Sequence, residues 1–320
     1  MRASARRSAA SLPEALRIAM AAHLQGMTDH ATLPGGGLFA QAWAMLRPPA
    51  VDALYGLLGT RAFTARGLWL NLGYWRDARS IEEACPALAL LVGQAAAIGP
   101  EDDVVDVGFG FADQDMLWAR QFAPRRITGL NVTPLHVRLG RARVRRAGLA
   151  DRIDLREGSA TAMPLPDACC DVVTALECAF HFDTRAGFLA EAFRVLRPGG
   201  RIVLADIIPA AAAGGALRRR WQRASWRALA RALAIPAANA DARDGYAARF
   251  GAAGFAAPEI RSIGADVFPG FHHALREDAA FFARLPGSAR LAYRPLLRFE
   301  AGDVYAGLDY VLASARKPQA

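Results

Sequence analysis

The residues of this chain that could do chemistry begin with an acid followed by two glycines, in the stretch Asp106-Val-Gly108-Phe-Gly110. Two apolar, β-branched residues, Val104 and Val105, precede the acid, and this pattern indicates a buried strand that ends in a tight turn. Because glycine has no Cβ, the backbone of such a turn can approach a flat or anionic ligand closely. The stretch therefore predicts a ligand-binding turn at the carboxyl end of a strand.

A second acid, Glu177, ends the apolar run that begins at Cys170. A carboxylate at the end of an interior strand costs free energy when it is buried without a partner. We therefore expect Glu177 to meet a ligand, a cation or water. Ligands of open α/β sheets bind outside the carboxyl ends of the strands, so both acids are predicted to face the same edge of a sheet.

The elements that must position these residues alternate between strands and helices. Further short strands are predicted at residues 126–131, 153–160, 170–177 and 201–206, and a helix over 188–196 stops at the Pro-Gly-Gly turn that ends at Gly200. This alternation favours right-handed crossovers and a parallel sheet, which is an α/β fold.

The stretch from about Asp102 to Ile208 resembles the class I S-adenosylmethionine-dependent methyltransferases, in particular the small-molecule branch with ubiquinone/menaquinone, tocopherol, sterol and natural-product enzymes. The first glycine turn and the Leu-x-Pro-Gly-Gly turn before the fifth strand carry the resemblance. It implies a Rossmann-like α/β fold: a seven-stranded, mostly parallel sheet with an antiparallel C-terminal strand and a helical N-terminal lid. Residues 260–267 and 309–315 would supply the closing hairpin.

The resemblance implies S-adenosylmethionine as the cofactor. Asp106 would lie under its methionine portion. Asn131 takes the place of the family's usual ribose-binding acid, and its amide can still accept from one hydroxyl and donate to the other, without the charge-assisted strength. Ser159 stands where an acid often accepts from the adenine amino group. The matched cofactor-binding residues are Tyr74, Trp75, Asp106, Gly108, Gly110, Gln114, Asn131, Ser159 and Glu177.

Each cofactor assignment has a structural alternative. Tyr74 and Trp75 could place an aromatic face near the sulfonium, whose positive charge is attracted to the ring, or they could form the core of the lid together with Trp69. Asp106 could merely cap the turn. Gln114 and the neighbouring Asp115 could be ordinary polar residues of a helix N-terminus.

The resemblance implies two arrangements for the chemistry. In natural-product O-methyltransferases, a histidine at the position of His181 takes the proton of the acceptor hydroxyl, and an acid at the position of Asp206 orients the imidazole. In sterol- and prenyl-type C-methyltransferases, an acid at the position of Glu177 stabilises a carbocation and removes a proton. The structural alternatives are a loop histidine and a strand-end cap. No histidine–acid pair has the spacing of a metal site, so we predict no metal.

Composition limits the other possibilities. The chain has 320 residues and a net charge of +9, but its arginines are spread over helix faces without interleaved aromatics, which disfavours nucleic acid as a partner. The four cysteines show no disulfide pattern and no run spans a bilayer, so a cytoplasmic protein is expected. A nicotinamide oxidoreductase is disfavoured because Ala112 interrupts the dinucleotide fingerprint. A non-catalytic cofactor-binding subunit stays open.

We expect three regions: a helical N-terminal extension and lid at 1–98, the cofactor-binding core at 99–210, and acceptor-pocket elements at 211–320. Helices are expected at 12–24, 38–45, 51–58, 81–97 and 217–233. The last carries Leu217, Trp221, Leu229 and Leu233 on one stripe among arginines, which fits either a packed lid helix or peripheral contact with anionic lipid. Candidate acceptor-pocket residues near the C-terminus are Phe268, Phe271, His272, His273, Phe281 and Phe282.

The sequence thus predicts methyl transfer from S-adenosylmethionine to a small, largely apolar acceptor that is natural-product, quinone or lipid-like, by O- or N-methylation. The alternative within the family is C-methylation of a prenyl, terpenoid or sterol-like alkene.

Overall fold

The computed structural model describes residues 63–285 and 287–319. The helices expected at 12–24, 38–45 and 51–58 lie outside the described residues.

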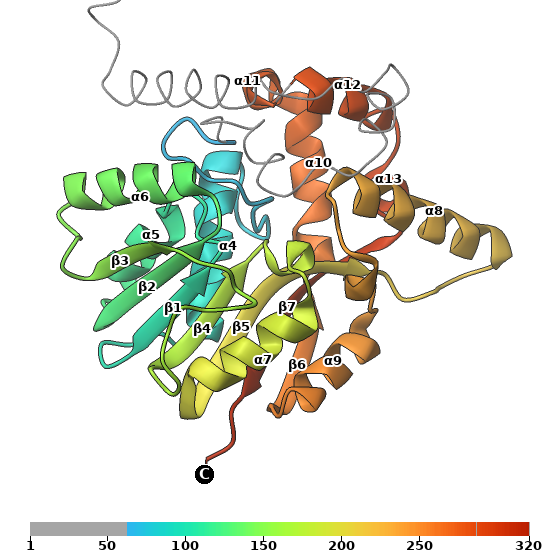
Figure 1. Ribbon diagram of the computed structural model, residues 1–320. Coiled ribbons are helices and arrows are strands. Elements are labelled where there is room, and N and C mark those ends of the chain that lie inside the picture. Colours follow the sequence, from blue (N-terminus) through green and yellow to red (C-terminus); the bar gives the residue numbers. More distant parts are fainter. Residues whose placement is uncertain (1–62, 286, 320) are drawn as a thin grey trace, which may run out of the picture. The chain divides into compact units, whose positions relative to one another are not determined.

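Seven strands form one sheet in the order β3-β2-β1-β4-β5-β7-β6 (Figure 1). Strands β1 to β5 pair in parallel, whereas β7 runs antiparallel to both β5 and β6. This confirms the predicted α/β fold with its antiparallel C-terminal strand. The strands are β1 Asp103–Val107, β2 Arg126–Asn131, β3 Ile153–Glu157, β4 Cys170–Leu176, β5 Leu196–Pro209, β6 Ala256–Ser262 and β7 Leu308–Arg316.

The closing hairpin differs in one strand from its prediction. β7 agrees with the expected 309–315, but β6 ends at Ser262, and the apolar residues Ile263 and Val267 are buried around a short 3-10 turn instead. β6 is an edge strand, and Pro258 fits there because an edge strand can spare a ladder hydrogen bond.

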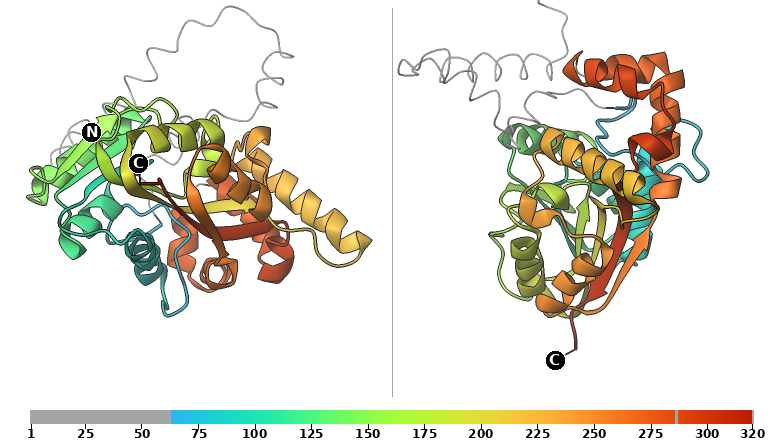
Figure 2. Two further views of the ribbon diagram at one scale, coloured as in Figure 1. Left: turned by 90° about the horizontal axis from the view of Figure 1, so that it is seen from below. Right: turned by 90° about the vertical axis from the view of Figure 1, so that its right-hand side faces the viewer.

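Helices cover both faces of the sheet (Figures 1 and 2). Alternate residues of β1 divide between two hydrophobic cores, because successive strand side chains point to opposite faces. Val104 joins the core that contains residues of α4 and α5, and Val105 joins the core that contains residues of α7 and α9. The helices are α4 Ile81–Ala95, α5 Asp113–Gln121, α6 Pro134–Arg146, α7 Arg185–Val195, α8 Ala216–Ala232, α9 Arg243–Ala252, α10 Phe268–Glu277, α11 Ala279–Arg284, α12 Gly287–Leu296 and α13 Ala301–Val304.

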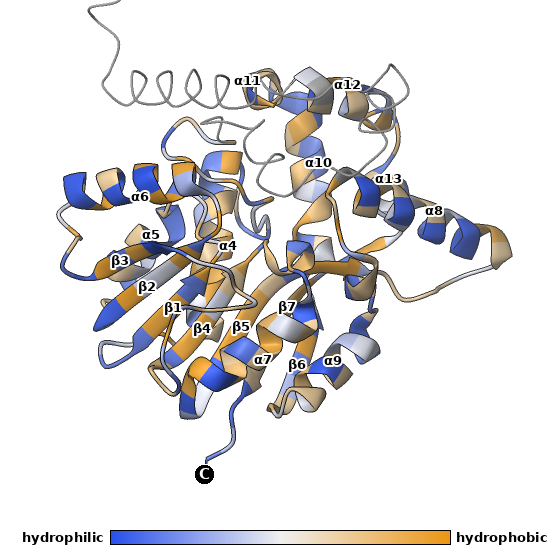
Figure 3. Cartoon of the chain, in the orientation of Figure 1, coloured by the Kyte–Doolittle hydropathy of each residue, from blue (hydrophilic) through white to orange (hydrophobic). Residues whose placement is uncertain are grey.

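The basic helix α8 combines the two behaviours expected of it. Leu229 and Leu233, at and just after its C-terminal end, are partly buried and line a cavity. Leu217 and Trp221, at the other end, are 84% and 52% exposed, among exposed arginines (Figure 3). The prediction of a single packed stripe is therefore right only for its C-terminal half. No described helix has the length and apolar character needed to cross a bilayer.

Candidate active site

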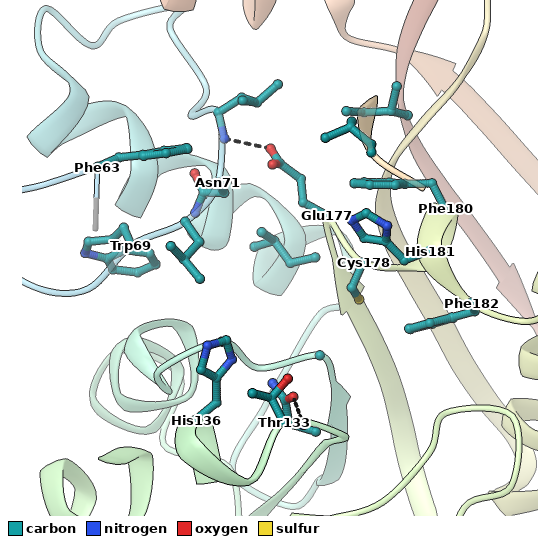
Figure 4. A pocket seen from close by; sticks show the side chains of 18 of the residues that line it. Phe63, Trp69, Asn71, Thr133, His136, Glu177, Cys178, Phe180, His181 and Phe182 are labelled. Carbon is teal, nitrogen blue, oxygen red and sulfur yellow. Dashed lines mark hydrogen bonds between the residues drawn. The ribbon is translucent and has the colours of Figure 1, made fainter. Parts of the chain in front are cut away.

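A cavity of about 660 Å³ lies at the carboxyl ends of the parallel strands. One part is lined by residues that follow β1, β2, β3 and β4, and the remainder by α8, α10, α12 and the segments beside them. Figure 4 shows Glu177 and His181 on one wall and His136 and Thr133 on another. The predicted site residues that line the cavity are Gly108, Gly110, Gln114, Asn131, Ser159, Glu177 and His181.

The two glycines of the first turn have different physical roles. Both have positive φ angles, 73° at Gly108 and 55° at Gly110. A Cβ at Gly108 would lie 2.6 Å from the Cβ and Sγ of Cys178, so packing alone excludes a side chain there. A Cβ at Gly110 would meet only Leu70, at 3.7 Å, and would otherwise project into open space of the cavity. Gly110 therefore leaves room for a ligand, as the predicted cofactor turn requires.

Asp106 is fully buried beneath this turn and does not itself line the cavity. Its carboxylate accepts hydrogen bonds from Gln114 Nε2 at 3.0 Å and Thr174 Oγ1 at 2.7 Å, and burial raises its pKa to about 7. Gln114 thus connects Asp106 to the cavity. Asp115, also fully buried, makes no side-chain hydrogen bond within the described residues, and burial raises its pKa well above the usual range.

Asn131 and Ser159 lie on the cavity side of the ends of β2 and β3. The Asn131 Oδ1 atom accepts from the backbone N–H of Thr133 at 2.9 Å, so the side chain also forms the turn into α6. The Ser159 hydroxyl lies 3.0 Å from that of Thr161. Sequence reasoning missed His136, which lines the same wall and packs against Phe111, because an apolar-flanked helical histidine carries no motif.

Glu177 follows β4 directly and has a left-handed backbone, with φ of 52°. Its Oε1 atom accepts from the backbone N–H of Leu72 at 2.8 Å and from the Tyr310 hydroxyl at 2.6 Å (Figure 4). Burial raises its pKa to about 7, and the two hydrogen bonds oppose that rise. These two donors are neutral groups of the protein, and the side chain also lines the cavity, so the expectation that Glu177 meets a ligand, a cation or water stays a prediction.

His181 ends the 3-10 turn Ala179–His181 and lines the cavity beside Phe180 (Figure 4). Burial lowers its pKa to about 4, so the imidazole is neutral near pH 7. A neutral imidazole can accept a proton, as the predicted general base must.

Asp206 is placed differently from its prediction. It is fully buried and accepts from Arg185 Nε and from the Tyr246 hydroxyl, both at 2.9 Å. Asp206 is not among the described residues that line the cavity. Its link to His181 is indirect: Arg185 also bonds Asn239, whose Nδ2 atom donates to the carbonyls of Phe180 and Phe182. The arrangement favours the alternative of a structural acid, because the carboxylate is committed to a buried ion pair.

Tyr74 and Trp75 lie outside the cavity lining, whereas Trp69 of the same segment lies within it. The Tyr74 hydroxyl donates to Asp266 at 3.3 Å, and the Trp75 indole donates to the Leu72 carbonyl at 2.8 Å. This packing supports their structural interpretation, and contact with the cofactor stays a prediction for both.

The remaining wall is mostly apolar. Of the predicted acceptor-pocket residues, Phe268 and Phe271 line it, while His273 is exposed and His272 is buried with Nε2 beside the Phe299 carbonyl. Sequence reasoning missed two tyrosines on this wall, Tyr293 and Tyr305, because no motif surrounds them. Within the described residues, no group of three or more His, Cys, Asp or Glu side chains could hold a metal ion.

Residues 105–204 match the family described as a methyltransferase domain. The chain is 36% identical over 289 residues to erythromycin 3''-O-methyltransferase of Saccharopolyspora erythraea, which covers 87% of this chain and 94% of that protein. It is 32% identical over 145 residues to 27-O-demethylrifamycin SV methyltransferase of Amycolatopsis mediterranei, covering 44% and 53% of the two chains.

Solved structures share the fold at lower identity. The [4+2]-cyclase SpnF has a TM-score of 0.64 at 23% identity, with 86% of this chain and 98% of that chain covered. Geranyl diphosphate C-methyltransferase from Streptomyces coelicolor A3(2) has a TM-score of 0.64 at 16% identity, with 84% and 98% covered. These likenesses establish the fold alone.

The sequence matches establish the cofactor, S-adenosylmethionine, and the activity, methyl transfer to a small molecule. The chain belongs to the class I S-adenosylmethionine-dependent methyltransferases.

Proposed function

We propose that this enzyme O-methylates a hydroxyl group of a mostly apolar, macrocyclic natural product. One observation carries the proposal: a single cavity joins the cofactor turn at Gly110 to an apolar wall, with His181 and Glu177 lining it as well. Two relatives support this acceptor class: erythromycin 3''-O-methyltransferase and 27-O-demethylrifamycin SV methyltransferase.

The residues that would hold S-adenosylmethionine are those around the first turn and the ends of β2 and β3. The open space beside Gly110 and the polar groups of Gln114, Asn131 and Ser159 fit a ligand with an amino-acid end, a ribose and an adenine. When bound there, the cofactor supplies an electrophilic methyl group. Catalysis by the chain is then mainly a matter of alignment in a site that excludes water.

The chain must also accept the proton that the acceptor hydroxyl loses as its oxygen bonds to the methyl carbon and the sulfur–carbon bond breaks. We assign this role to His181, because its imidazole lines the cavity and is neutral near pH 7. A pKa of about 4 makes it a weak base, so its contribution is expected at the lower end of the usual range for a general base. Asp206 acts as a positioning residue through Arg185 and Asn239, which hold the carbonyls on either side of His181.

One observation favours C-methylation of an alkene as a second candidate. The Glu177 carboxylate lines the cavity, and the two donors that bond it, Leu72 N–H and the Tyr310 hydroxyl, are uncharged. A carboxylate so placed could stabilise a carbocation and remove its proton. The same acid could instead hold the acceptor of an O-methylation by a hydrogen bond.

The test is label transfer from methyl-labelled S-adenosylmethionine to erythromycin lacking its 3''-O-methyl group and to 27-O-demethylrifamycin SV. We expect label in an O-methyl group of at least one product. Gly110→Val tests the cofactor turn: its side chain would occupy the space beside Gly110, so binding of S-adenosylhomocysteine and label transfer should both be lost. Gly110→Ala, which has the same strained backbone of φ 55° without the branched side chain, is the matched control for strain and should retain more binding. Transfer of label to carbon would favour the second candidate, and normal binding by Gly110→Val would refute the cofactor turn.

We further propose a cytoplasmic location, supported by the four cysteines, all of which are free thiols. The exposed arginines and the exposed Leu217 and Trp221 of α8 support peripheral contact with an anionic membrane.

A further inference from the structure

Two tyrosines of the acceptor wall are not needed by the chemistry proposed above. Tyr293 lies on α12, and Tyr305 follows α13. Both line the cavity, whose wall on that side is otherwise formed by apolar side chains such as Phe268, Phe271 and Leu285.

The Tyr305 ring is fixed in its place. It stacks on Phe268 with ring centroids 4.8 Å apart and planes inclined by 11°, and His272 packs against it edge-on at 5.8 Å. Stacked and edge-on contacts are favourable arrangements of aromatic rings, so the hydroxyl is held in one position. A ligand would therefore meet a preorganised group rather than a mobile one.

The Tyr305 hydroxyl is buried, and the polar side chain beside it in the described part of the chain, the Tyr293 phenol, does not form a well-aligned hydrogen bond with it. Leaving a buried hydroxyl unpaired is costly, and such a group in a native protein needs an explanation. Nothing in the packing of the ring requires the hydroxyl, because a phenylalanine would stack on Phe268 equally well. The hydroxyl therefore points to a ligand.

Tyr293 strengthens this interpretation. Its phenol is close enough to raise the pKa of Tyr305, and burial raises the pKa of both, so both are protonated near pH 7. Each phenol has one O–H donor. Even if one phenol donates to the other, the second O–H is still able to donate to a ligand. Tyr293, Tyr305 and Glu177 all line the same cavity.

We propose that Tyr305, with Tyr293, is a specificity subsite that donates a hydrogen bond to an oxygen of the acceptor other than the methylated one. The acceptor then carries a carbonyl, ether or second hydroxyl that reaches the tyrosine pair, and is not a plain hydrocarbon. This inference rests on the proposed function, since it assigns part of the same acceptor site.

The experiment compares Tyr305→Phe with the wild type, both saturated with S-adenosylhomocysteine, in the binding of cyclododecanone and of cyclododecene. We expect the wild type to prefer the ketone and Tyr305→Phe to bind it about three- to tenfold more weakly, the range for one neutral hydrogen bond. Binding of the alkene should stay the same. Tyr293→Phe should show a smaller loss in the same direction.

Ser225→Ala is the matched control. It removes a hydroxyl that bonds the carbonyl of Val304, next to Tyr305 but outside the cavity lining, so the ratio of ketone to alkene affinity should not change. The melting temperature of Tyr305→Phe should stay equal to or rise above that of the wild type, because the variant loses an unpaired buried hydroxyl.

A wild type that binds neither probe, or a variant that loses both equally, would overturn the subsite. So would a clear fall in the melting temperature of Tyr305→Phe with an unchanged affinity ratio. Failure of the wild type to methylate the two macrocyclic acceptors, with the ketone preference intact, would refute the proposed acceptors and leave the subsite standing.

Discussion

The carboxyl ends of β4 and β5 carry acids that look equivalent in the sequence and differ in the structure. Glu177, after β4, lines the cavity and accepts only from neutral donors, Leu72 N–H and the Tyr310 hydroxyl. Asp206, in β5, is fully buried against the guanidinium of Arg185, which is itself fully buried. The two strands are parallel neighbours in the sheet, and Leu176, just before Glu177, pairs with Ala205, just before Asp206.

The difference shows what makes a buried acid available for chemistry. A buried carboxylate with a charged, well-bonded partner is satisfied inside the protein and has no interaction left for a ligand. A buried carboxylate with only neutral donors keeps a raised pKa, and such groups cluster at functional sites. Position at a strand end predicts where an acid can act, and the partner decides whether it does.

The largest expected effect comes from breaking the Arg185–Asp206 pair. Arg185→Met would leave the Asp206 carboxylate buried without its cation, and Asp206→Asn would leave Arg185 unbalanced. Each should lower the free energy of unfolding by about 3–5 kcal/mol. The double variant Arg185→Met/Asp206→Asn should lose less than the sum of the two single losses, because its second change removes the charge that the first leaves unpaired.

Urea denaturation of the four proteins checks this prediction. Glu177→Gln, measured at pH 5, is the control for the comparison, since Glu177 is then mostly protonated and its amide substitute is similar in shape. Additive losses in the double variant would show that Arg185 and Asp206 do not act as a pair.

The next effect is on turnover. For a hydroxyl acceptor, His181→Ala should reduce kcat by roughly a hundredfold or more, the usual contribution of a general base. The loss should shrink at high pH as the acceptor ionises by itself, and affinity for S-adenosylhomocysteine should barely change. For an alkene acceptor, Glu177→Gln should be the damaging change, because an amide cannot take the proton of a carbocation.

Assaying both variants on one acceptor separates the two cases. Normal turnover in both would mean that neither residue acts on the acceptor and that alignment alone carries the reaction.

A smaller effect concerns the dependence of stability on pH. The pKa of Glu177 is raised from 4.5 to about 7, so the folded protein holds this proton more tightly than the unfolded chain does. Stability from this group is full below 4.5 and falls as the pH rises to about 7. Glu177→Gln removes this loss and should be more stable than the wild type at pH 8, by on the order of 1–3 kcal/mol.

Urea unfolding of the wild type and of Glu177→Gln at pH 5 and pH 8 measures this difference in stability. Asp106, whose pKa burial also raises to about 7, contributes with the same sign in both proteins and cancels in the difference. An equal difference between the two proteins at both pH values would contradict the raised pKa.

The sequence predicted the strand ends that hold the site residues, but not the side chains that bond to those residues. Apolar runs that end in Asp106, Asn131 and Glu177 predicted where β1, β2 and β4 end, because strand periodicity and glycine turns are local signals. The ion pair of Asp206 was beyond reach, since Arg185 opens a helix 21 positions away and its burial is a property of the packed fold. Tyr305 was missed for the same reason.

Asn131, at the end of β2, extends the comparison to a neutral strand-end group and gives the smallest expected effect. If its amide bonds the ribose of the cofactor, Asn131→Asp should bind S-adenosylhomocysteine at least as tightly, because a carboxylate can accept from both hydroxyls and still accept from Thr133 N–H. Asn131→Leu should bind several-fold more weakly, as expected for loss of a hydrogen bond of about 0.5–1.5 kcal/mol.

Calorimetry with both S-adenosylhomocysteine and S-adenosylmethionine separates contact with the ribose from long-range attraction of the charge, since only S-adenosylmethionine carries the sulfonium. Equal changes for the two ligands indicate contact with the shared ribose. Unchanged affinity in both variants would place Asn131 away from the ligand. Its side chain would then serve only the turn at Thr133.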